Sequence, residues 1–332
     1  MRRARPCPGP RQPRGATVRM NAFVRPLARP TTADAIAARL PAAALVGDPR
    51  RVVRGIGAVA SRVPDVLTFC DAADAADRLA AAPAAVIIVH SGTSAKPRSD
   101  QTFIVVDDVR AAFIDSVAFL LPDADRPADP PPGIDPTARI GESASIAPTA
   151  CIGARVEVGP RTRIGPGAVI HADAEIGSDC VIGPAAVIGW VGLAYHDRDD
   201  GRRTFFPHLA GVRIGNRVDV GAQACVCRGM LSHTVIGDDV KIGSLVYVSH
   251  GVVVGERAWL SAGTLVAGHA RIAAGALLGI GSVVVDNVHL ETGVAVGGGS
   301  VVTKNAAAGS RLYGVPAHPV PTMRRFGPTP RD

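Results

Sequence analysis

Three histidines in the second half of the chain have the residue type and spacing to do chemistry. His233, His250 and His269 are separated by 17 and 19 residues, and His250 interrupts the stretch VYVSHGVVVG, which is otherwise mostly aliphatic. An imidazole titrates near neutral pH, so His250 is a candidate general base. Neutral imidazoles that converge on one ion also bind zinc. A surface histidine with no role is the third interpretation, and the choice depends on the elements that carry these residues.

A six-residue repeat surrounds these histidines. From Ile134 to Ile188 an aliphatic residue recurs at every sixth position; the period resumes at Ile214 and, after a slip of four residues, runs from Ile236 to Val302. Two inward positions in every six residues are typical of a short strand followed by a turn, whereas an amphipathic helix repeats every 3.6 residues. The sequence therefore predicts a β-solenoid of stacked coils.

This repeat resembles that of the hexapeptide-repeat acyltransferases over residues 134–305. The resemblance implies a mainly β chain folded as a left-handed parallel β-helix, with three hexads in each triangular coil. Residues about 18 apart then lie on the same corner of adjacent coils, and His250 and Gly268 are such a pair, with His269 beside them. The zinc alternative resembles the γ-class carbonic anhydrases, whose close histidine pair is missing here. We therefore favour acyl transfer.

The segments that flank and interrupt the repeat resemble a narrower family. GIGAVASRVPDVLTF, AAVIIV and TFIVVDDVRAAFIDSVAFLL look like the small α/β domain that precedes the β-helix in the UDP-3-O-acylglucosamine N-acyltransferases of lipid A biosynthesis. RIGNRVDVGAQACVCRGM is similar to their central segment, and LYGVPAHPV resembles the exit motif of many hexapeptide transferases. The resemblance implies acyl transfer from a thioester on acyl carrier protein to the amine of a UDP-amino sugar, with no permanently bound cofactor.

Two alternatives to that activity remain open at this point. One is a nucleotide-sugar N-acetyltransferase that uses acetyl-CoA as its donor. The other is a catalytically silent relative that binds a ligand.

The resemblance also assigns roles to individual residues. The family histidine at the position of His250 acts as the general base. Gly268 falls where the family uses a backbone N–H to stabilise the oxyanion, and a glycine lets the thioester approach the main chain closely. His269 is expected either to assist or to be merely exposed.

Several positions depart from the family pattern. Phe69 matches the aromatic residue that the family stacks on uracil, but Ala72 and Ala75 stand where an asparagine and a tyrosine are expected. Cys227 replaces an aspartate, and a second family histidine two coils beyond the base is replaced near Asn287. The sequence therefore names no charge partner for the candidate base.

An insertion interrupts the hexads between Ile188 and Ile214. It concentrates four aromatic residues in a chain of which only 4% is aromatic. Long excursions from a solenoid are more often functional than decorative, so we expect these side chains to line the substrate site. The alternative is that they cap the side of the solenoid. The four residues are Trp190, Tyr195, Phe205 and Phe206.

Composition limits the class of partner. The formal net charge is +7, but eight arginines and no acidic residue fall within residues 1–30, so the rest is nearly neutral and we expect no nucleic acid partner. The six cysteines form no C-x-x-C pair, which suits a reducing compartment. No segment reaches about 18 consecutive apolar residues. We therefore expect a cytoplasmic protein without an integral membrane segment.

These observations predict four parts. Residues 1–20 form a disordered basic tail, with Met20 as a candidate start, and residues 21–130 form an α/β domain that resembles a nucleotide-binding domain. Residues 131–305 form the β-helix with the insertion at 189–213, and residues 306–332 form a C-terminal extension. An outward His250 needs an opposing wall, so we expect a homotrimer with its sites between chains.

Overall fold

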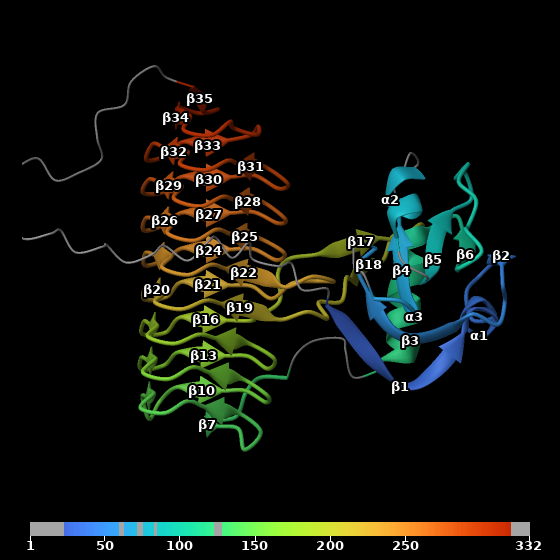
Figure 1. Cartoon of the computed structure of the whole chain (residues 1–332), viewed down its shortest axis with the longest axis horizontal. Helices are drawn as coiled ribbons and strands as arrows, with labels where there is room; N and C mark the ends of the chain where they lie inside the picture. The colour runs from blue at the N-terminus through green and yellow to red at the C-terminus, as the bar shows by residue number, and fades with distance from the viewer. Residues whose placement is uncertain (1–22, 60–62, 72–75, 83–84, 123–127, 320–332) are drawn as a thin grey trace, which may run out of the picture.

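The computed structural model describes residues 23–59, 63–71, 76–82, 85–122 and 128–319. The predicted basic tail and residues 320–332 of the C-terminal extension lie outside these ranges. The predicted mainly β architecture is confirmed: a parallel β-solenoid stands beside a small α/β domain, and the two are joined near the middle of the solenoid (Figure 1). None of the helices in the described part of the chain is long and apolar enough to cross a lipid bilayer.

The α/β domain is built on a six-stranded sheet in the order β1-β3-β4-β5-β6-β2. Strands β3 to β6 run parallel, whereas β1 and β2 pair antiparallel with their neighbours. The side chain of Asp108 caps α3 by accepting the N–H of Ala111 at 2.9 Å. The elements are β1 (Val24–Thr32), α1 (Ala33–Ala37), β2 (Ala44–Gly47), β3 (Val52–Gly57), β4 (Val66–Cys70), α2 (Ala76–Ala81), β5 (Ala85–His90), β6 (Gln101–Val106) and α3 (Val109–Leu120).

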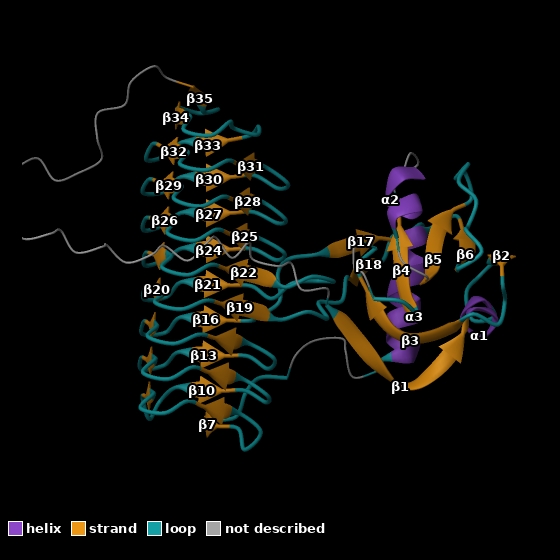
Figure 2. Cartoon of the chain, viewed as in Figure 1, coloured by secondary structure: helices purple, strands orange, loops and turns teal. Residues whose placement is uncertain are grey.

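The solenoid consists of three sheets of very short strands, stacked in columns (Figure 2). The first sheet contains β7 (Gly133–Ile134), β10 (Cys151–Ile152), β13 (Val169–Ile170), β16 (Val187–Ile188), β21 (Cys225–Val226), β24 (Tyr247–Val248), β27 (Leu265–Val266), β30 (Val283–Val284) and β33 (Val301–Val302). The second contains β8 (Arg139–Ile140), β11 (Glu157–Val158), β14 (Glu175–Ile176), β19 (Val212–Ile214), β22 (Thr234–Ile236), β25 (Val253–Val254), β28 (Arg271–Ile272) and β31 (His289–Leu290).

The third sheet completes the triangular cross-section and carries the last described strands. It contains β9 (Ser145–Ile146), β12 (Arg163–Ile164), β15 (Val181–Ile182), β20 (Asp219–Val220), β23 (Lys241–Ile242), β26 (Trp259–Leu260), β29 (Leu277–Leu278), β32 (Ala295–Val296), β34 (Arg311–Tyr313) and β35 (His318–Pro319). Because β34 pairs with β32, part of the predicted C-terminal extension continues the stack.

The core of the solenoid follows the six-residue period. In nearly every two-residue strand the second residue is buried and the first faces outward, so one continuous aliphatic core runs up the stack. The first coil is the exception to the predicted pattern, because Ile134 is 49% exposed. It has no coil beneath it to cover its side chain, as stacking requires.

Two irregularities interrupt the regular pairing of coils. Val169 pairs with Val187 across 18 residues, but the next pairs are Val187 with Cys225 and Cys225 with Tyr247. The first gap holds the insertion, residues 189–211, which contains the hairpin of β17 (Tyr195–Asp197) and β18 (Arg203–Phe205). The second gap holds a longer turn, residues 227–233, which we call the slip loop. Both leave the stack where a chain passes from the first sheet to the second.

The insertion attaches the α/β domain to the solenoid. Phe206 is buried and stacks on Phe113 of α3, with ring centroids 5.7 Å apart. His196 Nε2 lies 2.8 Å from Asp108 Oδ2, and Arg198 makes two hydrogen bonds to Asp115 at 2.6 and 3.1 Å. These contacts lie along α3 and combine apolar burial with charged hydrogen bonds.

One strand of the third sheet offers a matched test of this core. In β12, Ile164 is 2% exposed and points inward, whereas Arg163 is exposed on the outside. Ile164→Ala is expected to lower the free energy of unfolding by about 2–5 kcal/mol, because it leaves a cavity in a closely packed interior. Arg163→Ala is expected to change it by no more than about 0.5 kcal/mol. Chemical denaturation followed by circular dichroism measures both, and equal losses would contradict the assignment of the inward face.

Candidate functional site

The candidate residues gather along one edge of the solenoid. We call it the first–second edge, because it consists of the turns that lead from the first sheet to the second. The insertion follows β16, the slip loop follows β21, and His250 follows β24. Gly268 and His269 follow β27, and Asp286 follows β30. Stacking in register therefore brings into one column residues that are far apart in the sequence.

Three imidazole rings form a row on this edge. The ring centroids of His208 and His250 are 5.4 Å apart, those of His250 and His269 are 5.0 Å apart, and both pairs meet edge to face. His250 and His269 were predicted to be neighbours from their register. His208, which belongs to the insertion, was not identified in the sequence.

Glycines make room for the row. A Cβ atom at Gly268 would lie 2.7 Å from His250 Cε1, and a Cβ atom at Gly251 would lie 2.6 Å from His269 Nδ1. Both separations are shorter than a normal non-bonded contact, so a side chain at either position would force the facing imidazole ring to move. Gly268 is therefore needed for the close approach of the His250 ring to the main chain.

Hydrogen bonds fix the tautomer of His208. Its Nδ1 lies 2.9 Å from the carbonyl oxygen of Phe206, so Nδ1 carries the proton, and Nε2 accepts the N–H of Gly192 at 3.2 Å. The ring is 4% exposed. Burial, followed by the nearby His250, lowers the pKa of His208 to about 3. His208 is thus a neutral, fixed wall of the row at physiological pH.

His250 is also neutral at physiological pH. Burial, followed by the nearby His269, lowers the pKa of His250 to about 4, while the charge of Asp286 opposes this shift. Its Nδ1 is buried and has no hydrogen-bond partner among the described residues. Burial likewise lowers the pKa of His269, again against Asp286. An unprotonated imidazole is able to accept a proton from a substrate.

Asp286 is a further member of the site that sequence analysis missed. Its Oδ1 accepts the N–H of Gly268 at 2.8 Å, and its charge favours the protonated forms of His250 and His269. It lies 18 residues after Gly268, so the register that paired His250 with Gly268 also pointed to Asp286. The Gly268 N–H, predicted to stabilise an oxyanion, is engaged by this carboxylate in the structure.

The predicted aromatic residues lie in two places, beside the row of imidazoles and in the contact with the α/β domain. Phe205 stacks on His208 with ring centroids 5.3 Å apart, and Tyr195 packs edge to face on Phe205 at 5.6 Å. Phe206 and Phe69 instead pack together at 5.7 Å, in the contact between the insertion and the α/β domain. Phe206 therefore serves the domain contact rather than an open cleft.

The remaining predicted residues lie elsewhere. Trp190 packs against His171, with ring centroids 4.8 Å apart and the ring planes tilted by 44°. His233 packs against Phe23 at 5.0 Å and its Nδ1 accepts the N–H of Gly211 at 3.1 Å. Positions 72 and 75 lie outside the described residues. Within the described ranges no group of three or more His, Cys, Asp or Glu side chains is arranged to hold a metal ion.

Comparison with known proteins identifies the repeat. The family model described as bacterial transferase hexapeptide (six repeats) matches residues 137–172, 157–189 and 233–268. A probable mitochondrial UDP-3-O-acylglucosamine N-acyltransferase 2 of Arabidopsis thaliana is 34% identical over 41% of this chain and 45% of the relative. The UDP-3-O-acylglucosamine N-acyltransferase of Delftia acidovorans is 45% identical over 23% of each chain. The resemblance to these acyltransferases expected from the sequence is confirmed, although these matches span less than half the length of each relative.

The solved structures that match this chain are less similar to it in sequence than these two relatives are. The UDP-N-acetylglucosamine O-acyltransferase of Moraxella catarrhalis is 28% identical, with 56% of this chain and 73% of that chain covered and a TM-score of 0.38. The Arabidopsis UDP-N-acetylglucosamine acyltransferase is 23% identical, with coverages of 56% and 71% and a TM-score of 0.43.

The lowered pKa of His208 makes a prediction about stability. Its pKa is about 3 in the folded chain against an ordinary value of 6.5, so the unfolded chain takes up the proton first as the pH falls. The stability associated with this residue is therefore complete above pH 6.5 and is lost progressively toward pH 3. His208→Gln preserves an acceptor for Gly192 and a donor for Phe206 but does not titrate.

Chemical denaturation between pH 6.5 and 4.5 tests this linkage. The free energy of unfolding of the unsubstituted chain should fall more steeply than that of His208→Gln, by up to about 1.4 kcal/mol per pH unit. Parallel pH profiles for the two proteins would show that His208 is not held neutral by the fold.

Proposed function

We propose that this hexapeptide-repeat chain is an N-acyltransferase that acts on a sugar nucleotide. In this proposal it transfers an acyl group from a thioester on acyl carrier protein to the amine of a UDP-amino sugar, in the cytoplasm, as a step of lipid A biosynthesis. The printed names of its curated relatives support the acceptor class. The observation that carries the proposal is the neutral imidazole of His250, packed on Gly268 and facing the insertion that holds the α/β domain.

The proposed reaction requires one proton acceptor and no redox chemistry. The amine nitrogen attacks the thioester carbonyl carbon, and His250 accepts the proton that the nitrogen gives up. The C–S bond then breaks, and the departing thiolate takes that proton from the imidazolium. The products are an amide and a free thiol. For Gly268 to stabilise the intermediate oxyanion, the thioester oxygen must displace the carboxylate of Asp286 from the Gly268 N–H.

In this proposal the α/β domain binds the nucleotide part of the acceptor. Parallel strands β4, β5 and β6 end at one edge of its sheet, and α3 begins immediately after β6. Ligands of open α/β sheets bind at such carboxyl ends. Arg110, in the first turn of α3, forms an ion pair with Asp71 at 2.7 Å. After burial, its positive charge is one of the smaller causes that lower the pKa of His269. We place the diphosphate of the acceptor near Arg110 and its base near Phe69.

An activity assay with acyl carrier protein and CoA thioesters and a panel of nucleotide amino sugars tests the function. His250→Ala is expected to lower turnover by about 100-fold to 10,000-fold while the fold remains intact, because the general base is lost. His289→Ala, an exposed residue on the outside of β31, is the matched control. Normal turnover in His250→Ala would remove His250 from the mechanism. Transfer only from CoA would favour the acetyltransferase alternative, and no transfer from any donor would favour a silent ligand-binding protein.

The outer faces of the solenoid support the proposed homotrimer. The outward residues of the first sheet are mostly apolar, whereas those of the second sheet include Arg139, Glu157, Glu175 and Arg271. Leu265 on the first sheet is 44% exposed. An apolar face backed by a rigid core fits a second copy of the chain, and this face ends at the edge that carries His250. A neighbouring copy would thus add a wall to the site.

Light scattering tests the assembly. We expect a mass of about three times 34.1 kDa for the unsubstituted chain. Leu265→Glu should dissociate the trimer because it places a charge in the apolar contact, and activity should fall with the mass. Arg163→Glu, at the equivalent outward position of β12 on the third sheet, is the control. A fully active monomer would contradict both the trimer and the shared site.

A further inference from the structure

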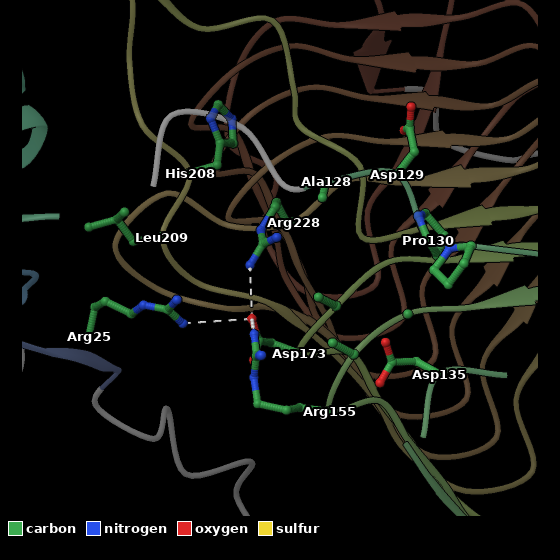
Figure 3. Close-up of a pocket in the computed structure, with 14 residues that line it drawn as sticks. Arg25, Ala128, Asp129, Pro130, Asp135, Arg155, Asp173, His208, Leu209 and Arg228 are labelled. Carbon is green, nitrogen blue, oxygen red and sulfur yellow. Dashed lines mark hydrogen bonds and ion pairs between the residues drawn. The ribbon is translucent and has the colours of Figure 1, made fainter. Parts of the chain in front are cut away.

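A cavity opens at the first–second edge on the side of the insertion away from His250. Its volume is about 260 Å³. Separate parts of the chain form its wall: β1, the linker that enters the solenoid, three coil corners, and the junction of the insertion with the slip loop (Figure 3). His208 lines this cavity on one side and contacts His250 on the other. The proposed acyl transfer makes no use of the cavity.

Three arginines converge on one carboxylate in the cavity wall. Arg155 binds Asp173 with two hydrogen bonds, at 2.7 and 3.0 Å. Arg25 Nη1 and Arg228 Nη2 approach the same oxygen, Asp173 Oδ2, only to 3.7 and 3.8 Å, which exceeds hydrogen-bond length. Figure 3 shows the Arg25 and Arg228 guanidinium groups reaching Asp173 from different sides. Arg155 alone therefore satisfies the carboxylate.

A second arginine–aspartate pair on the solenoid shows what a structural pair requires. Arg161 and Asp179 are also 18 residues apart and form the same two hydrogen bonds, at 2.6 and 2.7 Å, at the edge between the second and third sheets. There one arginine makes both hydrogen bonds to the carboxylate. A pair that only stabilises a coil corner therefore does not require the two additional guanidinium groups that lie near Asp173.

Arg228 is the unusual member of this group. It is 4% exposed, and its Nε donates to the carbonyl oxygen of Ala210 at 2.7 Å. Burial lowers the pKa of Arg228, and the charge of Asp173 only partly offsets this effect. A buried guanidinium with incomplete charge compensation is costly unless an anion reaches it. The slip loop and the insertion hold it in this position.

We propose that this cavity is a binding site for a phosphate-class anion, held between Arg25 and Arg228. Both guanidinium groups lie against the same oxygen of Asp173, so one tetrahedral anion is able to bridge them and accept several hydrogen bonds at once. Asp129 and Asp135 also line the cavity and oppose an anion. Asp129 is exposed to solvent and Asp135 is engaged by Thr137, and Figure 3 shows both on the side away from Arg25. Solvent therefore screens the repulsion between these two carboxylates and an anion more than it screens the attraction between the anion and the buried Arg228.

Calorimetric titration of the full chain with pyrophosphate, at constant ionic strength, tests the site. We expect saturable binding with one site per chain. Arg25→Gln and Arg228→Gln should each weaken binding at least about tenfold, because each removes a charge-assisted interaction. Arg161→Gln should leave it unchanged, since that arginine belongs to the matched pair elsewhere. No binding by the unsubstituted chain, or equal weakening by Arg161→Gln, would overturn the proposal.

Asp173→Asn separates an anion site from a purely structural cluster. If the arginines serve only to hold Asp173, this change weakens the cluster and creates no affinity for pyrophosphate. If they form an anion site, removal of the competing carboxylate should strengthen binding several-fold, and unchanged or weaker binding in a folded Asp173→Asn protein would contradict the site. Titrations with inorganic phosphate and with UDP then identify the source: tighter binding of UDP that is also lost in Arg25→Gln assigns the site to a nucleotide diphosphate, and otherwise to a free phosphate.

Discussion

The parallel hydrogen-bond ladder between successive coils is the constraint on which the rest of the structure depends. Each strand of the solenoid is only two or three residues long, so no coil is stable without a neighbour above or below it. The ladder holds when residue i meets residue i + 18, as Cys151 meets Val169. It also keeps the aliphatic residue of each hexad pointing inward, because a slip by one residue would turn the core side chains outward. Extra residues are therefore accommodated only in turns.

The insertion and the slip loop both extend from the first–second edge, and they are hydrogen-bonded to each other there. The backbone N–H groups of Leu209 and Ala210 in the insertion both donate to the carbonyl oxygen of Met230 in the slip loop, at 2.9 and 3.0 Å. Met230 also packs with the cluster that contains the core of the α/β domain. The two breaks in the ladder thus form one platform, which holds the second domain beside the row of imidazoles.

Positions that are fixed by the regular stacking of coils could be predicted from the sequence. The position of a residue in the irregular insertion could not. The solenoid followed from the six-residue spacing. The neighbouring positions of His250, Gly268 and His269 followed from that spacing together with the three hexads per coil that the family resemblance implies, because the ladder repeats through them. Asp286 obeys the same spacing and was overlooked although its signal was present. His208 had no such signal, since it lies in the insertion, whose path depends on its contacts with α3. Those contacts are tertiary, and no local pattern encodes them.

Burial under this platform explains the opposite chemistry of its two sides. Removal from water disfavours every charge, but the outcome depends on whether the group is able to lose its proton. On the upper side His250 responds by staying neutral, which is the form that a proton acceptor needs. On the lower side Arg228 is more deeply buried, at 4% exposed, but keeps its proton at physiological pH, so an anion is needed to offset its charge. One physical effect, applied to two side-chain types on either side of His208, thus prepares one place for proton transfer and another for binding negative charge.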